Sequence, residues 1–357
     1  MKSHRYRSVE LVAGFRMIAA CAISGFAWSP IATQAASLSA FTGTIAGYSG
    51  NIAGGCTTSG PPSELAFFPG AAAGLQVLGG NAACGFSGGW TNLTSTSSTN
   101  PLTNSTTLAP TRLGSSPNAK SFDASADARA TYGSLSARAH GHYSGPVVSY
   151  YDNASAAAVS AATFSDTLTA TLPTSYANVS SRGFVSYQFT IDGNANAPGP
   201  PTAFLNGSTQ IAFNIQHDDG TIYGLLNGST RTGTPGDVRG AAAASGWTLG
   251  NGSLSGASSF QSSLFSIDLA SSWNFKAGLI VDVWGNADND FYSTARLVGI
   301  DLFDAQRRLI DGYSIASASG VNYMAAAVPE PASTTLLIAG LMVLLGCARA
   351  RLERPSR

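Results

Sequence analysis

The feature that most constrains the fold is a period-two alternation of apolar and polar residues, which recurs in strand-length runs between residues 122 and 315. In the run 132–143, Leu135 and two alanines fall on one side, whereas Arg138, His140 and His142 fall on the other. Successive side chains of a strand point to opposite faces, so this pattern predicts strands with one buried face. Similar runs cover residues 159–172, 183–192, 210–216, 263–269, 279–284, 294–303 and 308–315. Because Gly, Pro and Asn turns separate them, we expect an all-β protein, a β-sandwich with a jelly-roll-like arrangement.

The composition of residues 36–328 supports a β-rich body. Gly, Ser, Thr, Ala and Asn dominate, and every acidic residue except Glu64 is an aspartate, which favours turns and caps over helix interiors. Sixteen acidic residues against eleven basic ones give a net charge of −5. This charge argues against a nucleic-acid partner and against an anionic membrane surface.

Residues 36–117 are the least regular part of the chain and precede a β-sandwich body at 118–327. Within them, residues 91–107 are almost entirely Ser, Thr and Asn. Because Pro101 and the absence of apolar alternation disfavour a central strand, we expect a solvated loop there. An edge strand is the alternative, since threonine fits a pleated surface.

The N-terminus has the organisation of a secretory signal peptide. A basic start precedes the apolar residues 17–28, and small residues at 32–35 predict cleavage after Ala35, so that the signal peptide is residues 1–35. A lipoprotein anchored at Cys21 is the alternative, but Arg16 lies too close to that cysteine. The body then keeps two cysteines, Cys56 and Cys84, which we expect to form a disulfide in an oxidising compartment.

The C-terminus combines a proline box, an apolar run and a basic tail. The box is Val328, Pro329, Glu330 and Pro331, and the run at 334–348 contains no charge. Arg349, Arg351 and Arg354 follow it and predict a stop in the bilayer with the tail in the cytoplasm. As a helix the run would be about 22 Å long, shorter than the roughly 30 Å hydrocarbon core. Such a transmembrane helix suits temporary residence in the membrane.

The order of proline box, apolar helix and basic tail resembles the PEP-CTERM sorting signal of Gram-negative bacteria. The closing pattern at 290–295, 299–300 and 313–317 is also similar to that of many PEP-CTERM proteins. The resemblance implies that signal peptidase and an exosortase process the chain. It further implies passage through the inner membrane to the cell surface or extracellular matrix of an exopolysaccharide-producing bacterium.

Residues 217–220, His-Asp-Asp-Gly, follow a predicted strand. Adjacent carboxylates of Asp218 and Asp219 can present oxygens to a hard cation such as Ca²⁺. The Asp-Asp-Gly sequence resembles a loop of protective-antigen-type lectin modules, in which paired acids help to hold calcium and a sugar hydroxyl. The alternative is a hairpin turn with solvated acids, since Asp-Gly itself favours such turns.

A second set of oxygen ligands, Asn286, Asp288 and Asp290, has alternate spacing that would suit Ca²⁺ if the segment were a loop. The glycine and terminal glutamate of an EF-hand are missing, so a solvated loop is the alternative.

His140 and His142 would supply half of a metal site, but no partner lies near them in sequence, which favours exposed histidines on a polar face.

Tryptophans would stack on sugar rings if they were exposed, although core packing is the more frequent use of such side chains. The residues concerned are Trp90, Trp247, Trp273 and Trp284, with Tyr150 and Tyr151, and we expect Trp284 in the core.

The sequence holds no G-x-S-x-G, H-E-x-x-H, Walker or dinucleotide motif. We therefore expect an exported structural or adhesive protein without catalytic activity and with exopolysaccharide as its partner. The alternatives are a calcium-dependent carbohydrate-binding module and a polysaccharide-modifying hydrolase with aspartate catalysts. No cofactor other than Ca²⁺ is indicated.

Overall fold

The computed structural model describes residues 36–48, 63–68, 87–96, 100–113, 120–144, 154–176, 180–198, 207–244 and 246–324. These residues form almost only strands in antiparallel sheets, which confirms the predicted all-β class. Within them, no helix is long and apolar enough to cross a membrane. The predicted signal peptide, Cys56, Cys84 and the predicted sorting signal lie outside the described residues and stay predictions.

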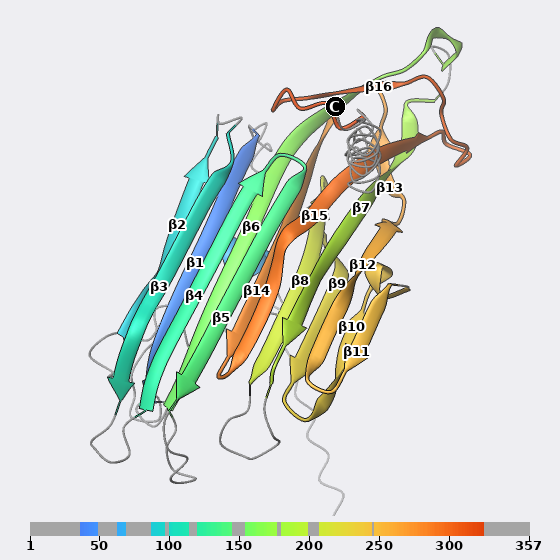
Figure 1. The fold of residues 1–357 in the computed structure, drawn as a ribbon. Helices are drawn as coiled ribbons and strands as arrows, with labels where there is room; N and C mark the ends of the chain where they lie inside the picture. The colour runs from blue at the N-terminus through green and yellow to red at the C-terminus, as the bar shows by residue number, and fades with distance from the viewer. Residues whose placement is uncertain are drawn as a thin grey trace, which may run out of the picture. The chain divides into compact units, whose positions relative to one another are not determined.

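Two antiparallel sheets face each other as a sandwich (Figure 1). Sheet A contains, in spatial order, β10 (Thr234–Arg239), β9 (Ile222–Arg231), β8 (Ser208–His217), β14 (Ser272–Trp284), β6 (Ala154–Thr171), β1 (Ser37–Tyr48) and β2 (Ser87–Ser95), and β16 (Ser314–Ser317) pairs with β6. Sheet B contains β11 (Trp247–Gly250), β12 (Ser253–Gln261), β7 (Arg182–Asn196), β15 (Ala287–Phe303), β5 (Ser134–Ser144), β4 (Lys120–Thr131) and β3 (Leu102–Leu113), and β13 (Phe265–Asp268) pairs with β7. The short 3-10 helices are η2 (Ser63–Phe67), η4 (Thr174–Tyr176) and η5 (Ala241–Ala244).

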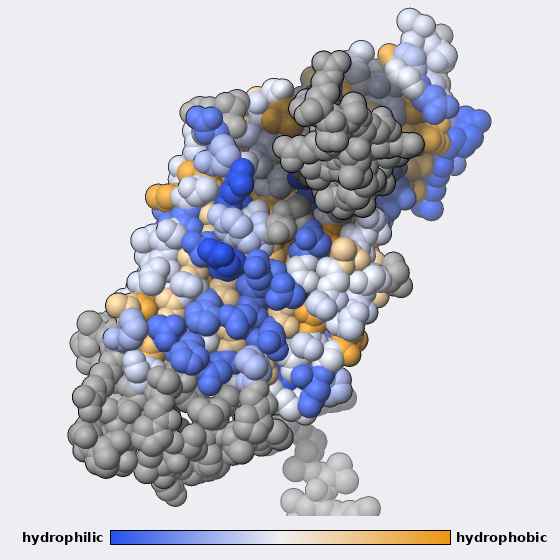
Figure 2. All heavy atoms as spheres, in the orientation of Figure 1, coloured by the Kyte–Doolittle hydropathy of each residue, from blue (hydrophilic) through white to orange (hydrophobic). Residues whose placement is uncertain are grey.

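The strands of sheet B turn apolar side chains inward and polar ones outward. On β5, Leu135, Ala137 and Ala139 are buried. Arg138, which lies between the two alanines, and His142, which follows them, are exposed. Figure 2 shows hydrophilic residues gathered on the face turned to the viewer, over β4, β5 and β15 as they lie in Figure 1. The alternation read from the sequence therefore separates the core from an outward polar face.

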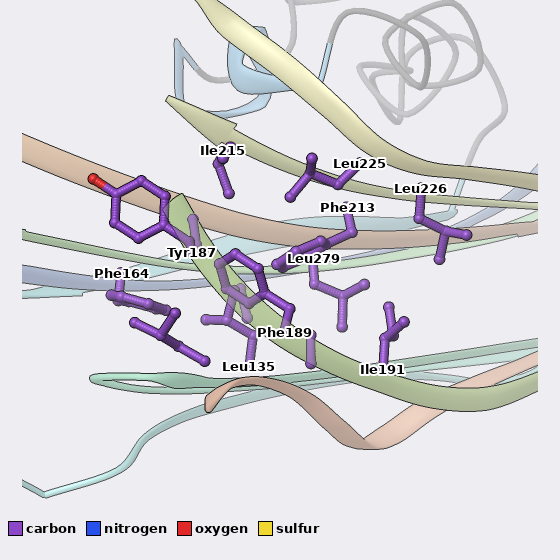
Figure 3. Packing of buried hydrophobic residues seen from close by; sticks show 14 of the residues in the cluster. Leu135, Phe164, Tyr187, Phe189, Ile191, Phe213, Ile215, Leu225, Leu226 and Leu279 are labelled. Atoms are coloured by element: carbon purple, nitrogen blue, oxygen red, sulfur yellow. The ribbon is translucent and has the colours of Figure 1, made fainter. Parts of the chain in front are cut away.

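The core has an alanine-rich part and an aromatic part. Where β4 and β5 face β1 and β6, the inward residues are mainly alanines, and Cα atoms of facing strands approach within 8 Å. That spacing is closer than the roughly 10 Å of ordinary packed sheets, because alanine fills little space. Between β7, β8 and β14, Tyr187 stacks on Phe275 with ring centroids 4.1 Å apart, and Phe189 packs against Phe213. Figure 3 shows Tyr187, Phe189 and Phe213 pointing into this layer.

The edge strands overturn one prediction. A loop at residues 91–107 is wrong for most of that segment, and the edge-strand alternative is right, since β2 and β3 form edges of sheets A and B. The Asn104 side-chain amide donates to the carbonyl oxygens of Ala40 and Thr91, at 3.0 Å each. These bonds link the two sheet edges, so polar side chains stabilise strands that lack apolar alternation. The described strands of residues 36–117 thus belong to the same two sheets as the body.

The outer face of sheet A is also partly apolar. Helix η2 and the residue after it lie on this face, and the Asn214 side-chain amide donates to the Phe67 carbonyl oxygen at 2.8 Å. A second cluster of buried residues results, separate from the core between the sheets. Its larger members are Phe41, Ile45, Leu65, Phe67, Phe68, Val159 and Ile280.

The predicted runs up to residue 303 all overlap observed strands, but the last run, 308–315, does not form the expected strand. Asp304 explains the difference, because its carboxylate accepts hydrogen bonds from the backbone amides of Gln306 and Arg308 and from the Arg308 guanidinium. These bonds hold a tight turn, and only β16 at Ser314–Ser317 follows as a strand.

The last described residues, 314–324, form what we call the C-terminal strap. After β16 has paired with β6, the buried Asp166 of β6 accepts hydrogen bonds from the backbone amide and hydroxyl of Ser319 and from the hydroxyl of Tyr323. The Tyr323 ring is itself buried and stacks on Phe164. One carboxylate therefore fastens the strap to the sandwich.

Candidate functional site

Two rows of polar residues cross the outer face of sheet B. His140 of β5 lies opposite Asp288 of β15, which lies opposite Asn196 of β7. In the next row, Arg138 lies opposite Asp290, which lies opposite Asn194. Facing residues of adjacent strands have Cβ atoms about 4.5–5.5 Å apart, so each row is continuous. A hollow of about 330 Å³ opens between these residues.

The electrostatics of this face are those of exposed ion pairs. The Arg138 guanidinium lies 3.0 Å from the Asp127 carboxylate and 5.1 Å from the centroid of the Tyr292 ring. Because half of the Arg138 side chain is exposed, this pair adds little to stability. Its contribution is to hold the guanidinium in place beside the hollow.

Two histidines and two aspartates form a cluster at one end of this face. The His140 Nδ1 atom is hydrogen-bonded to Asp288, and its Nε2 atom lies 3.5 Å from Asp123 Oδ2. The His142 Nδ1 atom lies 3.1 Å from Asp123 Oδ1. The hydrogen bond to Asp288 raises the pKa of His140, and the nearby charges of Asp288 and Asp123 outweigh the opposing effect of partial burial. In the described part of the chain, no group of three or more His, Cys, Asp or Glu side chains is placed to hold a metal ion as the side chains stand.

The structure places the predicted Asn286, Asp288 and Asp290 differently from either interpretation of the sequence. Strand β15 begins at Ala287, so the two aspartates stand on the outer face of a strand, and only Asn286 precedes it. The Asp290 carboxylate accepts a hydrogen bond from the Tyr292 amide, and Asp288 contacts His140. The three residues do not surround a common loop, and the two aspartates instead join the polar rows.

The predicted Asp218 and Asp219 lie in the turn between β8 and β9. The Asp218 carboxylate accepts hydrogen bonds from the backbone and side-chain amides of Asn274, at 3.1 and 3.0 Å. The Asp219 carboxylate accepts from the Thr221 amide at 2.9 Å and from the Tyr223 hydroxyl at 3.2 Å. Both side chains are exposed, and each retains lone pairs for a further ligand.

His217 lies behind this turn and lines a hollow of about 520 Å³ together with both aspartates, Tyr223 and Phe265. Its ring stacks on Phe265, with centroids 5.2 Å apart, and its Nε2 atom is buried without a hydrogen-bond partner. Burial lowers the pKa of His217 despite the two neighbouring carboxylates, so the imidazole is neutral at pH 7. The hollow therefore combines apolar walls, two acids and one neutral imidazole.

The tryptophans divide between core and surface. Trp273 is buried and donates from Nε1 to the Tyr187 hydroxyl at 3.0 Å. Trp90 on edge strand β2 is 41% exposed, whereas Trp247 and Trp284 are half-buried. Trp284 is thus less deeply placed than expected, because it faces the outer side of sheet A. Tyr150 and Tyr151 lie outside the described residues.

Sequence reasoning missed Asp123, Asn194 and Asn196, which come from strands far apart in the chain. His140 and Asp288, for example, are 148 residues apart. The signal that was available is the alternation itself, since it places each of these residues on the polar side of its own strand.

A comparison of the chain with protein-family models, with curated proteins and with solved structures found no match.

Proposed function

We propose that this chain is an exported, exosortase-sorted protein of the cell surface or extracellular matrix of a Gram-negative bacterium, with a structural or adhesive and non-catalytic role. The signal-peptide pattern at the N-terminus and the resemblance of residues 328–357 to a PEP-CTERM signal support export and processing. The body between them is the sandwich. A jelly-roll-like path is supported by the chain passing from one sheet to the other between β5 and β6, β6 and β7, β7 and β8, and β14 and β15.

The observation that carries the adhesive role is the pair of polar rows on the outer face of sheet B. Asn194, Asn196, Asp288 and Asp290 present amide and carboxylate groups on neighbouring strands around one shallow hollow. Such groups both donate to and accept from sugar hydroxyls. An extended polysaccharide can lie along a flat sheet face, which gives many weak contacts rather than one deep pocket. The net charge of −5 over residues 36–328 suits a hydrated, neutral polymer.

Asn194→Ala combined with Asn196→Ala is expected to reduce binding to the polysaccharide extracted from the matrix of the producing cells. We expect a weakening of about tenfold, because two lost hydrogen bonds of roughly 0.5–1.5 kcal/mol each correspond to that change. The measurement is co-sedimentation with the immobilised polymer. Asn227→Ala, at an exposed site on the outer side of sheet A, is the matched control. Equal retention of the double variant and the control would contradict the proposed contact.

The hollow at His217 favours a second candidate, a calcium-dependent carbohydrate-binding module. The two turn aspartates would hold Ca²⁺, and the Tyr223 and Phe265 rings would border the sugar. In that case, retention on the same polymer should require Ca²⁺ and should be lost in the Asp218→Asn, Asp219→Asn double variant. Retention that is insensitive to chelator and to these substitutions would leave the sheet B face as the contact.

The sorting proposal predicts a processed chain. In cells with the exosortase, the intact mass of the protein from envelope and medium should correspond to a C-terminus near residues 328–331. In cells without the enzyme, the mass should still include the apolar run 334–348. A species that retains the run in both strains would contradict sorting and would point to an inner-membrane protein anchored by its tail.

A further inference from the structure

Three side chains with metal-binding atoms lie on one outward face of sheet B. His140 and His142 are two residues apart on β5, so their side chains leave the sheet on the same side. Asp123 of β4 is the register partner of His142 and lies diagonally opposite His140. Facing Cβ atoms are about 4.5–5.5 Å apart and diagonal ones about 7–8 Å. The backbone therefore brings all three side chains within reach of one point.

The Asp123 carboxylate already lies close to one nitrogen of each imidazole, through its Oδ1 atom for His142 and its Oδ2 atom for His140. The Asp123 carboxylate oxygens lie 3.1 Å from His142 Nδ1 and 3.5 Å from His140 Nε2. Two ligand atoms bound tetrahedrally to zinc at about 2.0–2.1 Å are roughly 3.3 Å from each other. The two imidazole rings are nearly parallel, with centroids 6.4 Å apart. One ring would have to rotate for both imidazole nitrogens to bind the same metal ion. Both rings are well exposed, at 39% and 49%, which leaves room for that rotation.

Asp288 of β15 completes the arrangement from the other side. It is the register partner of His140 and is hydrogen-bonded to its Nδ1 atom, so the Nε2 atom faces Asp123. Metal-binding histidines almost always bond their second ring nitrogen to a carboxylate, a carbonyl oxygen or water, which fixes the tautomer and raises the basicity of the ligand. Asp288 occupies that positioning role here.

We propose that His140 Nε2, His142 Nδ1 and the Asp123 carboxylate form a binding site for a zinc-class transition-metal ion, with Asp288 as the positioning residue. Two imidazoles and one carboxylate suit Zn²⁺, Co²⁺, Ni²⁺ or Cu²⁺, whereas Ca²⁺ and Mg²⁺ select oxygen ligands. Because the site is half exposed, the remaining coordination positions are open to water or to an external ligand. The inference concerns metal binding alone and does not depend on the proposed polysaccharide contact.

Zn²⁺ is the probe for the test. The protein, purified without a histidine tag and stripped with a chelator, is titrated with Zn²⁺ by calorimetry, and Co²⁺ absorption reports the ligand geometry. We expect one equivalent to bind, with the visible spectrum of tetrahedral nitrogen and oxygen coordination. His142→Ala and Asp123→Asn should each weaken binding at least 100-fold. Asp288→Asn should weaken it by about 10–100-fold and alter the Co²⁺ spectrum.

Asp127→Asn is the matched control, since Asp127 lies on the same face of β4, two rows from Asp123, and pairs with Arg138 instead. Its affinity for Zn²⁺ should stay within about twofold of the parent value. Far-ultraviolet circular dichroism of the metal-free variants checks that each one folds. The proposal is overturned if the parent protein binds no stoichiometric Zn²⁺, if His142→Ala and Asp123→Asn bind as the parent does, or if equimolar Ca²⁺ displaces the Zn²⁺.

Discussion

Asp282→Asn is expected to raise the free energy of unfolding by about 3 kcal/mol at pH 8 and to change it little at pH 4. Asp282 lies in β14, paired with Val159 of β6 and Gln210 of β8, and its side chain is 3% exposed. Neither carboxylate oxygen has a hydrogen-bond partner of good geometry. Burial raises the pKa of Asp282 from 3.8 to about 7, although the nearby Gln210 amide opposes the shift.

The direction of the effect follows from proton linkage. Because the folded state holds the Asp282 proton up to about pH 7 and the unfolded state releases it near pH 3.8, the folded protein loses stability as the pH rises through that interval. A shift of about three pKa units corresponds to roughly 4 kcal/mol at 1.36 kcal/mol per unit. Asparagine removes this loss but leaves its own amide without a partner, so the expected net gain is smaller.

Urea unfolding of the parent protein and the variant at several pH values between 4 and 8 measures this prediction. The two curves of stability against pH should diverge as the pH rises above about 4, where the unfolded chain begins to release the Asp282 proton. Asp290→Asn is the control, since Asp290 stands exposed on strand β15 of sheet B. Parallel curves for the parent protein and Asp282→Asn would show that the buried carboxyl is not protonated at neutral pH.

The strands of the body could be predicted because their signal is local. Each of β5 and β7 carries its own alternation, and burial on one face preserves it. The same reasoning failed where a side chain stabilises the fold by hydrogen bonds. Asn104 stabilises an edge strand within a Ser/Thr-rich segment through its side-chain hydrogen bonds. Asp304 stabilises a turn at the start of a segment whose apolar residues predicted a strand.

The candidate sites were harder to predict because they depend on register between distant strands. The sequence shows His140 and His142 as a pair, but only the pairing of β4 with β5 and of β5 with β15 brings Asp123 and Asp288 to them. The burial of Asp282 could not be predicted for a different reason. An aspartate within an apolar run gives no local sign of which face of the sheet it occupies or of what buries it.

Asp166→Ala is expected to lower the free energy of unfolding by about 4 kcal/mol. The substitution removes the acceptor of three hydrogen bonds that fasten the C-terminal strap, from the Ser319 amide at 3.1 Å, the Ser319 hydroxyl and the Tyr323 hydroxyl at 2.7 Å. Bonds to a charged acceptor contribute roughly 1.5–3 kcal/mol each, and they do not add fully. The Tyr323 hydroxyl would also be left buried without its acceptor.

The measurement is urea unfolding of Asp166→Ala, Tyr323→Phe and the double variant. Tyr323→Phe should cost about 1–2 kcal/mol, and the double variant should cost less than the sum of the two, because both substitutions break the same bond. Asp127→Ala removes an exposed ion pair and should change stability by less than about 1 kcal/mol. Additive costs in the double variant, or a loss below 1 kcal/mol in Asp166→Ala, would contradict the role assigned to this carboxylate.

The position of the strap connects the Asp166→Ala prediction with the proposed sorting. The strap ends at Met324, and the proline box begins at Val328. The proposed cut near residues 328–331 would therefore leave every strap contact on the side of the body. Limited proteolysis of the parent protein should spare residues 314–324, whereas Asp166→Ala should expose them to cleavage before the sandwich unfolds. If protease reaches the strap equally in both proteins, Asp166 does not fasten it, and the pairing of β16 with β6 must hold the strap instead.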